Sequence, residues 1–333
     1  MSLARAETLD RRSAMLRTAM GEAIAQALAD PAVVEVMVNP DGRLWIDRLG
    51  EGRCDTGRTL SASDVERIIR LVASHVRTEV HAEAPIVSGE LPARGEALVG
   101  ERFEGVLPPV APAPCFSIRK PAIRIHSLAD YVEGGVMAPV QAELLRAAVG
   151  ERANILIAGA TSSGKTTLAN ALLAEVARQD ERVVILQDTL ELQCAAKDCV
   201  LLRTRPGLVS LTDLVRSTLR LRPDRIVVGE VRGGEALDLL KAWNTGHPGG
   251  LATVHANSAR AALYRLEQLV QEVVAVAPRR LIAEAVDLVV FLRGRGSSRC
   301  VETVVRVSGL DATGDYLLAD LDPPQLKVLR GDS

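Results

Sequence analysis

The pattern of apolar and polar residues over the first third of the chain predicts a mixture of strands and helices. Residues 33–47, VVEVMVNPDGRLWID, are two β-rich runs around an Asn-Pro-Asp-Gly turn, which is typical of a hairpin. Residues 61–76 place apolar side chains from Ile68 to Val76 on one helical face, behind serines that can cap the helix. Residues 102–120 then resemble two strands joined by a proline-rich connection. We therefore predict a smaller α+β domain over residues 1–121.

Beyond residue 138 the pattern changes to apolar strand-like runs that alternate with helical segments. The strand-like runs are residues 153–160, 182–188, 224–230, 250–255, 285–294 and 301–309. This alternation is typical of an α/β domain with a mostly parallel sheet, which we predict over residues 139–333. Residues 122–138 end close to Gly134-Gly135 and are interpreted as a linker between the two domains.

One segment of the second domain matches the phosphate-binding P-loop, G-x-x-x-x-G-K-[ST]. The matching residues are Gly159, Ala160, Thr161, Ser162, Ser163, Gly164, Lys165 and Thr166, and Thr167 follows them. A buried strand precedes the motif and a helix follows it, which is the context that a P-loop requires. Backbone N–H groups at a helix N-terminus bind phosphate oxygens, Lys165 is expected to reach the β- and γ-phosphates, and the Thr166 hydroxyl to ligate Mg²⁺. The motif predicts that the protein binds ATP and Mg²⁺.

Acidic residues at the ends of neighbouring strands are candidates for the remaining chemistry. Asp188 ends one strand, and Glu191 lies three residues further on. Glu230 follows Gly229, which stands where a Walker B strand usually ends in Asp. We expect Glu230 to orient or deprotonate the attacking water and to contact Mg²⁺ through water. The alternative interpretations are a helix cap for Asp188 and a surface ion pair for Glu230.

Two of the five histidines flank the strand at residues 250–255. His255 ends this strand, and because ligands bind at the carboxyl ends of strands in open α/β sheets, His255 is expected to contact the γ-phosphate. Zinc binding is the competing hypothesis, but no further His or Cys stands at ligand spacing. His247 lies in a Gly-Pro turn, where it either relays the nucleotide state or only shapes the loop.

Composition narrows the class of protein further. The net charge of −2 and the aromatic content of 2% do not favour direct nucleic-acid binding. Five cysteines without a C-x-x-C pair suit a reducing compartment rather than a disulfide framework, and a metal site at Cys194 and Cys199 is weakly supported. No apolar run is long enough to span a bilayer and no signal peptide is evident. We expect a cytoplasmic protein that is at most peripheral on a membrane.

Four motifs in order resemble those of the type IV secretion traffic ATPases, and most closely the conjugal-transfer members. They are GATSSGKTT, ILQDTLEL, LRPDRIVVGEVRGGEA and NTGHPGGLATVHANS, although Gln187 stands where many members have Glu. The resemblance extends over nearly the whole chain. In the first domain, GERFEGVLPPV and FSIRKPA resemble the segments whose arginines bind the nucleotide, which implies this role for Arg102 and Arg119. Arg77, Arg124, Arg203 and Arg205 match less clearly.

The resemblance implies a RecA-like ATPase domain preceded by a domain for sensing and oligomerisation. It also implies a homo-oligomer, a hexameric ring, that works at the inner membrane with other channel ATPases and inner-membrane components. Such a motor powers pilus assembly and transfer of DNA or protein. The alternatives are a pilus-retraction or type II secretion ATPase, a non-hydrolysing nucleotide-gated scaffold and a DNA-translocating motor. Many type II secretion ATPases carry a four-cysteine insert, which this sequence lacks.

Overall fold

The computed structural model describes residues 3–93, 100–121, 125–205 and 207–321. The chain divides into two compact units, Met1–Ile123 and Arg124–Ser333, and each has its own sheet and core. Arg124 itself lies outside the described residues. Among the described residues, no helix combines the length and the apolar character needed to cross a membrane.

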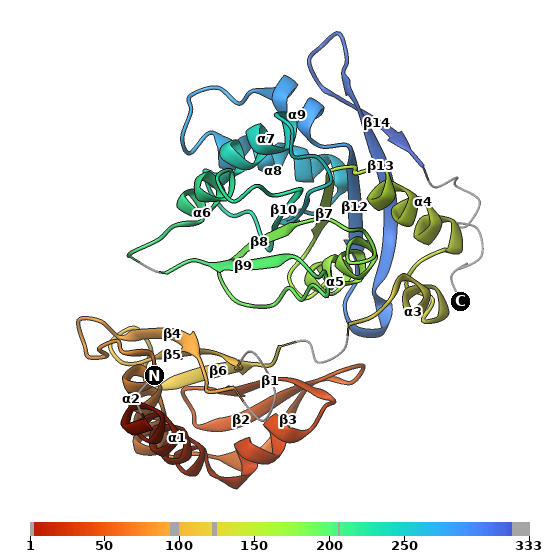
Figure 1. The fold of residues 1–333 in the computed structure, drawn as a ribbon. Helices are drawn as coiled ribbons and strands as arrows, with labels where there is room; N and C mark the ends of the chain where they lie inside the picture. Colours follow the sequence, from red (N-terminus) through yellow and green to blue (C-terminus); the bar gives the residue numbers. More distant parts are fainter. Residues whose placement is uncertain (1–2, 94–99, 122–124, 206, 322–333) are drawn as a thin grey trace. The chain divides into compact units, whose positions relative to one another are not determined.

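The first unit is an antiparallel sheet with two helices on one face (Figure 1). Its elements are α1 (Leu3–Ala29), β1 (Val33–Val38), β2 (Arg43–Arg48), β3 (Gly52–Thr59), α2 (Ala62–Val76), β4 (Ile86–Glu90), β5 (Arg102–Val106) and β6 (Cys115–Arg119). The strand order is β3-β2-β1-β6-β5-β4. The structure confirms the predicted hairpin as β1 and β2, and the two strands around the proline-rich connection as β5 and β6.

Helix α2 follows the local signals in the sequence. Ser61 is the N-cap, and its hydroxyl oxygen accepts a hydrogen bond from the backbone N–H of Asp64. Ile68, Ile69 and Val72 are fully buried between the helix and the sheet. The 3.6-residue spacing of these side chains gives the helix one apolar face, and burial of that face stabilises the packing on the sheet.

The second unit is an eight-stranded sheet with helices on both faces (Figure 1). Its elements are α3 (Leu128–Glu133), α4 (Pro139–Gly150), β7 (Ile155–Gly159), α5 (Lys165–Val176), β8 (Val183–Gln187), β9 (Cys199–Arg203), α6 (Leu211–Thr218), β10 (Arg225–Val228), α7 (Glu235–Asn244), β11 (Leu251–His255), α8 (Ala259–Val270), α9 (Arg279–Ala285), β12 (Leu288–Arg293), β13 (Cys300–Leu310) and β14 (Tyr316–Asp320).

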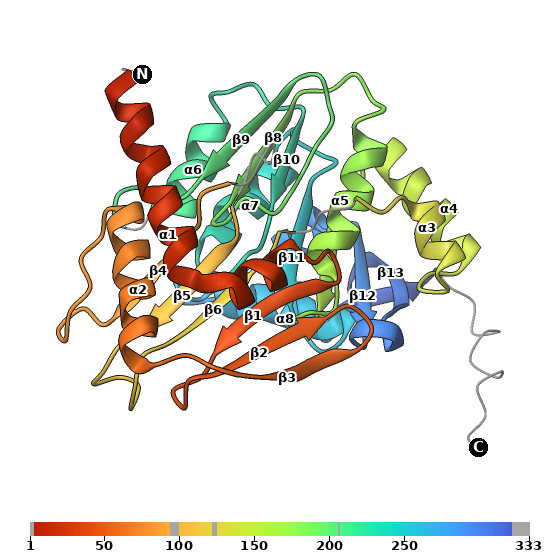
Figure 2. The ribbon, with the colours of Figure 1, turned by 90° about the horizontal axis from the view of Figure 1, so that it is seen from below.

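The strand order of this sheet is β14-β13-β12-β7-β11-β10-β8-β9. The strands from β12 to β9 in this order pair in parallel, and only β13 and β14 are antiparallel. The predicted mostly parallel α/β sheet is thus confirmed. Helices α3, α4 and α5 contribute to the core on one face, and α6, α7, α8 and α9 to the core on the other, a layering that Figure 2 shows from a second side.

Part of the segment interpreted as a linker is a helix of the second unit. In α3, Ser127 and Asp130 form a capping box, because each side chain accepts a hydrogen bond from the backbone N–H of the other residue. Leu128 and Tyr131 are buried in the core that also holds α4 and α5. The helix has only six residues, of which Leu128 and Tyr131 are buried, so it is too short to show a helical period in the sequence pattern.

Candidate nucleotide site

The P-loop connects the end of β7 to the start of α5, as the motif predicts. A Cβ atom at Gly159 would lie 2.7 Å from the carbonyl oxygen of Leu292 on β12, so this position excludes a side chain. Gly164 has φ +94° and Ser162 has φ 63°, so the loop uses left-handed backbone conformations. Successive residues in such conformations direct N–H groups into one concavity, which is the geometry that binds phosphate.

Lys165, His255 and Glu230 lie in contact at the carboxyl edge of the sheet. Nζ of Lys165 donates to the carbonyl oxygens of Gly159 and Ala160, at 3.0 Å each, and lies 3.2 Å from Nδ1 of His255. Nε2 of the same imidazole lies 2.6 Å from Oε1 of Glu230. The strand order β7-β11-β10 explains the sequence of contacts, because His255 ends the middle strand of the three.

The imidazole of His255 is held neutral by its surroundings. Burial lowers its pKa below 6.5, the charges of Lys165 and Arg232 act in the same direction, and only Glu230 opposes them. A neutral ring with the proton on Nε2 fits both neighbours, since Nδ1 then accepts from Lys165 and Nε2–H faces the carboxylate. The proton position is assigned from these contacts.

Arg232 is a member of the site that the sequence motifs did not single out. Its Nε donates to Oε2 of Glu230 at 2.7 Å, and its Nη1 lies 3.7 Å from Oδ2 of Asp188. The guanidinium therefore holds one carboxylate oxygen of Glu230, and His255 lies against the other. The available signal was the spacing of two residues between Glu230 and Arg232, which places both side chains on one side of an extended segment.

A second group of contacts surrounds the Thr166 hydroxyl, which donates to Oε2 of Glu191 at 3.3 Å. The side-chain oxygen of Gln187 accepts from the backbone N–H groups of Glu191 and Leu192, at 3.0 and 2.9 Å. Nδ2 of Asn170 donates to the carbonyl oxygen of Glu191 at 3.1 Å. Gln187 and Asn170 thus hold the turn that carries Glu191 from two sides. The Glu191 carboxylate contacts the hydroxyl of Thr166 in the P-loop.

Gly229 has a packing reason for lacking a side chain. A Cβ atom there would lie 3.1 Å from Cβ of Gln187, closer than nearly all real contacts between such atoms. Gln187 itself is 2% exposed, and its Nε2 has no hydrogen-bond partner among the described residues. The lack of a side chain at Gly229 therefore leaves room for Gln187 at the end of β8.

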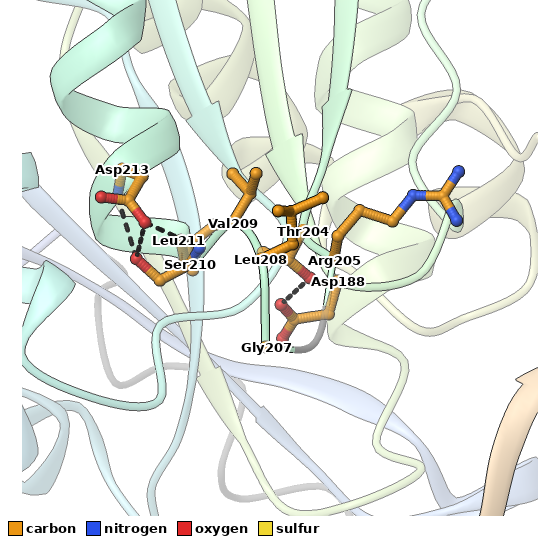
Figure 3. Close-up of a pocket in the computed structure, with 9 residues that line it drawn as sticks. All are labelled: Asp188, Thr204, Arg205, Gly207, Leu208, Val209, Ser210, Leu211 and Asp213. Atoms are coloured by element: carbon orange, nitrogen blue, oxygen red, sulfur yellow. Dashed lines mark hydrogen bonds between the residues drawn. The ribbon is translucent and has the colours of Figure 1, made fainter. Parts of the chain in front are cut away.

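Asp188 lies at the border of this site rather than at its centre. Thr204 donates to its Oδ1 at 2.9 Å, so Asp188 is not a helix cap. It also lines a depression of about 550 Å³ with Thr204, Arg205, residues 207–211 and Asp213 (Figure 3). The Ser210 and Asp213 side chains of this wall hydrogen-bond to each other, and Lys165 and His255 do not belong to it. The depression and the P-loop are therefore separate features of the second unit.

His247 and His255 lie at opposite ends of strand β11. His255 ends β11 on the P-loop edge, whereas His247 lies before the strand begins. The five residues of β11 span about 16 Å. Nδ1 of His247 is buried and has no hydrogen-bond partner among the described residues. Direct contact of His247 with a phosphate at this P-loop is therefore excluded, and the relay interpretation stays a prediction.

Arg102 and Arg119, both in the first unit, are register partners on β5 and β6. Since their neighbours Phe103 and Ile118 belong to the core under the helices, the two arginines lie on the other face of the sheet. On the same face, Arg102 also lies opposite Glu90 and Arg119 opposite Glu35, so each guanidinium has a carboxylate as its other register partner. Of the arginines that matched less clearly, Arg77 is the left-handed C-cap of α2, Arg203 ends β9, and Arg205 lines the depression of Figure 3.

The cysteines are free thiols. Burial, with the neighbouring Cys194, raises the pKa of Cys199 to about 12, which leaves this thiol protonated. Among the residues that the structure describes, no three His, Cys, Asp or Glu side chains gather as a metal site.

These features define a P-loop nucleotide-binding protein of the α/β class. They are the glycine-rich loop between β7 and α5, the buried Lys165, and the acidic residues at the ends of the adjacent strands. The family model described as "Type II/IV secretion system protein" matches residues 16–312, and the chain belongs to this family.

Individual relatives agree with this membership. The chain is 50% identical over 303 residues to a probable conjugal transfer protein TrbB of Sinorhizobium fredii, covering 90% of this chain and 91% of the relative. It is 34% identical over 330 residues to the type IV secretion system protein PtlH of Bordetella pertussis, covering 87% and 95%. The solved structure of the pilus retraction motor PilT with bound ADP shares the fold, with a TM-score of 0.60 and 17% identity over 89% of this chain and 80% of that one. The resemblance drawn from the motifs is confirmed.

Proposed function

We propose that this protein is a Mg²⁺-dependent ATPase with a RecA-like catalytic domain, which powers conjugal transfer through a type IV secretion machine. The observation that carries the proposal is the contact of Lys165, His255 and Glu230 at the P-loop edge. One arrangement thereby joins a phosphate-binding cation, a neutral imidazole and a carboxylate. The conjugal-transfer relatives support the assignment to this machine.

The residues around the P-loop divide the chemistry between them. Thr166 and Glu191 are suited to hold Mg²⁺, which when bound neutralises charge on the phosphates. Lys165 binds the β- and γ-phosphate oxygens, and Nε2–H of His255, which faces Glu230 in this structure, turns to donate to the γ-phosphate when nucleotide is bound. Glu230 orients the attacking water, and the Arg232 guanidinium holds its carboxylate in place. Glu230 also contacts Mg²⁺ through water, and Asp188 supports Arg232 from the border of the site.

The motor function extends beyond one site. We propose that Arg102 and Arg119 bind the nucleotide from the first unit, where they form a pair of guanidinium groups suited to phosphate. We further propose a homo-hexamer in the cytoplasm, peripheral on the inner membrane, with channel ATPases and inner-membrane components as partners. Hydrolysis removes the γ-phosphate and with it the contacts that stabilise the ATP-bound conformation. The resulting conformational change is the movement that the motor uses.

Phosphate release with Mg²⁺ and ATP tests the enzymatic part. The wild type is expected to release phosphate, whereas Glu230→Gln is expected to bind a fluorescent ATP analogue with unchanged affinity and to release about 10²–10³-fold less phosphate. Glu284→Gln, which changes an exposed glutamate on α9, is the matched control and should retain full activity. A wild type that binds ATP and does not hydrolyse it would support the non-hydrolysing scaffold instead.

Light scattering with and without ATP and Mg²⁺ tests the assembly separately. A particle of six chains supports the ring, and a monomer under both conditions contradicts it. DNA stimulation of the ATPase that falls steeply with salt would favour a DNA-translocating motor.

A further inference from the structure

The connection between β12 and β13 brings Arg299 against the P-loop. A Cβ atom at Gly164 would lie 2.9 Å from both Cζ and Nε of the Arg299 guanidinium. Gly159, the other P-loop glycine, faces the carbonyl oxygen of Leu292 at the end of β12. The end of β12 and the connection after it thus flank both glycines of the loop, and the guanidinium lies beside the residue at which α5 begins.

The charge on Arg299 lacks a counter-ion in this position. Its side chain makes no hydrogen bond or ion pair within the part of the chain that the structure describes, and its Nε is buried. The N-terminus of α5 carries the positive end of the helix dipole. A guanidinium beside this helix N-terminus is unfavourable by itself, and a bound anion would convert the repulsion into attraction.

Two further polar atoms nearby are buried without a hydrogen-bond partner. Oγ of Ser163, in the P-loop, is one, and the Tyr131 hydroxyl on α3 is the other. Ser163 is fully buried and Tyr131 is 5% exposed. Burial raises the pKa of Tyr131, and the positive charge of Arg299 opposes this shift, so the phenol lies within the electrostatic range of the guanidinium. Since buried polar groups are seldom left unsatisfied, this cluster indicates a ligand beside the loop.

We propose that Arg299 is a further nucleotide-binding residue, whose guanidinium donates to phosphate oxygens of the ATP or ADP held by the P-loop. This inference rests on the proposed ATPase function and extends its site to the β12–β13 connection. Arginine suits the role because its planar fork donates two parallel hydrogen bonds to phosphate and is always charged. The resulting charge-assisted bonds serve both ATP and ADP, since the two share the phosphates nearest the start of α5.

The test compares Arg299→Gln and Arg299→Lys with Arg295→Gln, which changes an exposed arginine of the same connection. Titration with fluorescent ATP and ADP analogues is expected to show about 10- to 100-fold weaker binding of both nucleotides to Arg299→Gln. Arg299→Lys should bind with intermediate affinity, because it keeps the charge and loses the fork. Arg295→Gln should bind like the wild type.

Thermal unfolding separates binding from structural support. Without nucleotide, Arg299→Gln is expected to unfold at or above the wild-type temperature, since it removes an unpaired charge. At an ATP concentration that saturates the wild type, the rise in unfolding temperature should be smaller for Arg299→Gln than for the wild type. A lower unfolding temperature without nucleotide, together with unchanged nucleotide affinity, would overturn the proposal and leave Arg299 a packing residue. Failure of the wild type and of Arg295→Gln to bind ATP would instead contradict the proposed function itself.

Discussion

Nζ of Lys165 lies 3.2 Å from Nδ1 of His255, although 90 residues separate them in the sequence. The contact exists because β11 lies directly beside β7, so that the P-loop lysine and the last residue of β11 meet at one sheet edge. A cation 3.2 Å from an imidazole nitrogen requires that nitrogen to be unprotonated. The pair therefore links the phosphate-binding group to the histidine's protonation state.

Lys165→Ala is expected to abolish ATP turnover, because no other described side chain of the P-loop supplies a positive charge to the β- and γ-phosphates. Phosphate release under saturating Mg²⁺ and ATP measures this. Lys241→Ala, an exposed lysine on α7, is the matched control and should be fully active. Turnover above one tenth of the wild-type rate in Lys165→Ala would contradict the assignment.

His255→Ala is expected to slow hydrolysis about 10- to 100-fold and to leave ATP affinity nearly unchanged. The reason is that the ring contacts Lys165 and Glu230 and would touch only the γ-phosphate of the nucleotide. Steady-state kinetics and equilibrium binding of ATP and ADP measure the two effects. His81→Ala, which changes an exposed histidine of the first unit, serves as the control. Equal turnover in His255→Ala and the wild type would remove the γ-phosphate role.

Because the pKa of His255 is lowered in the folded protein, we expect the free energy of unfolding to fall at acidic pH. Its pKa is below 6.5 in the folded protein, so the unfolded chain binds the proton first as the pH falls. The stability contributed by the neutral ring is present above pH 6.5 and is lost as the pH falls through the folded-state pKa. Urea midpoints measured from pH 8 to pH 5 should therefore fall more for the wild type than for His255→Gln. A histidine resonance of His255 that titrates above pH 6.5 would contradict this.

Gln187→Met is expected to lower kcat about tenfold and to raise the Mg²⁺ concentration needed for half-maximal activity. The change removes the oxygen that accepts from the N–H groups of Glu191 and Leu192, and each unsatisfied buried N–H costs about 1–3 kcal/mol. Gln187→Glu keeps an acceptor at the same place and should restore the Mg²⁺ requirement to that of the wild type. If Gln187→Met and Gln187→Glu show the same Mg²⁺ dependence, Gln187 does not position Glu191.

Among single substitutions away from the site, we expect a substitution of Arg225 to cause the largest loss in the free energy of unfolding. It is 1% exposed, pairs with Glu181, and donates to the carbonyl oxygens of Val149 and Gly249 at 2.9 and 3.2 Å. Arg225→Met leaves Glu181 paired with Arg152 alone and leaves two carbonyl groups without their donor, and each unsatisfied buried acceptor should lower the free energy of unfolding by about 1–3 kcal/mol. Denaturant unfolding measures this, and Arg216→Met, an exposed arginine on α6, is the control. A loss below 1 kcal/mol would show that the cluster is dispensable.

Local chemistry in the sequence determined much of this protein. The P-loop could be read from its glycines and hydroxyls because backbone conformation and phosphate binding depend on adjacent residues. The hairpin at β1 and β2 and the cap of α2 are likewise short-range features. The exposed strand β3 and the short helix α3 were missed, since neither has enough apolar residues to show a period.

The order of strands was decided only by the tertiary structure. In space, β7, β11, β10 and β8 are neighbours in this order, whereas along the chain β8 follows β7 directly. This order places His255 between Lys165 and Glu230. Arg232 and Arg299 acquire their positions in the same way, since an arginine outside a motif is indistinguishable from a surface arginine until packing decides what it touches. The sequence determined which groups can bind phosphate, and long-range strand pairing decided which of them meet, because pairing energy is gained between segments that no local pattern connects.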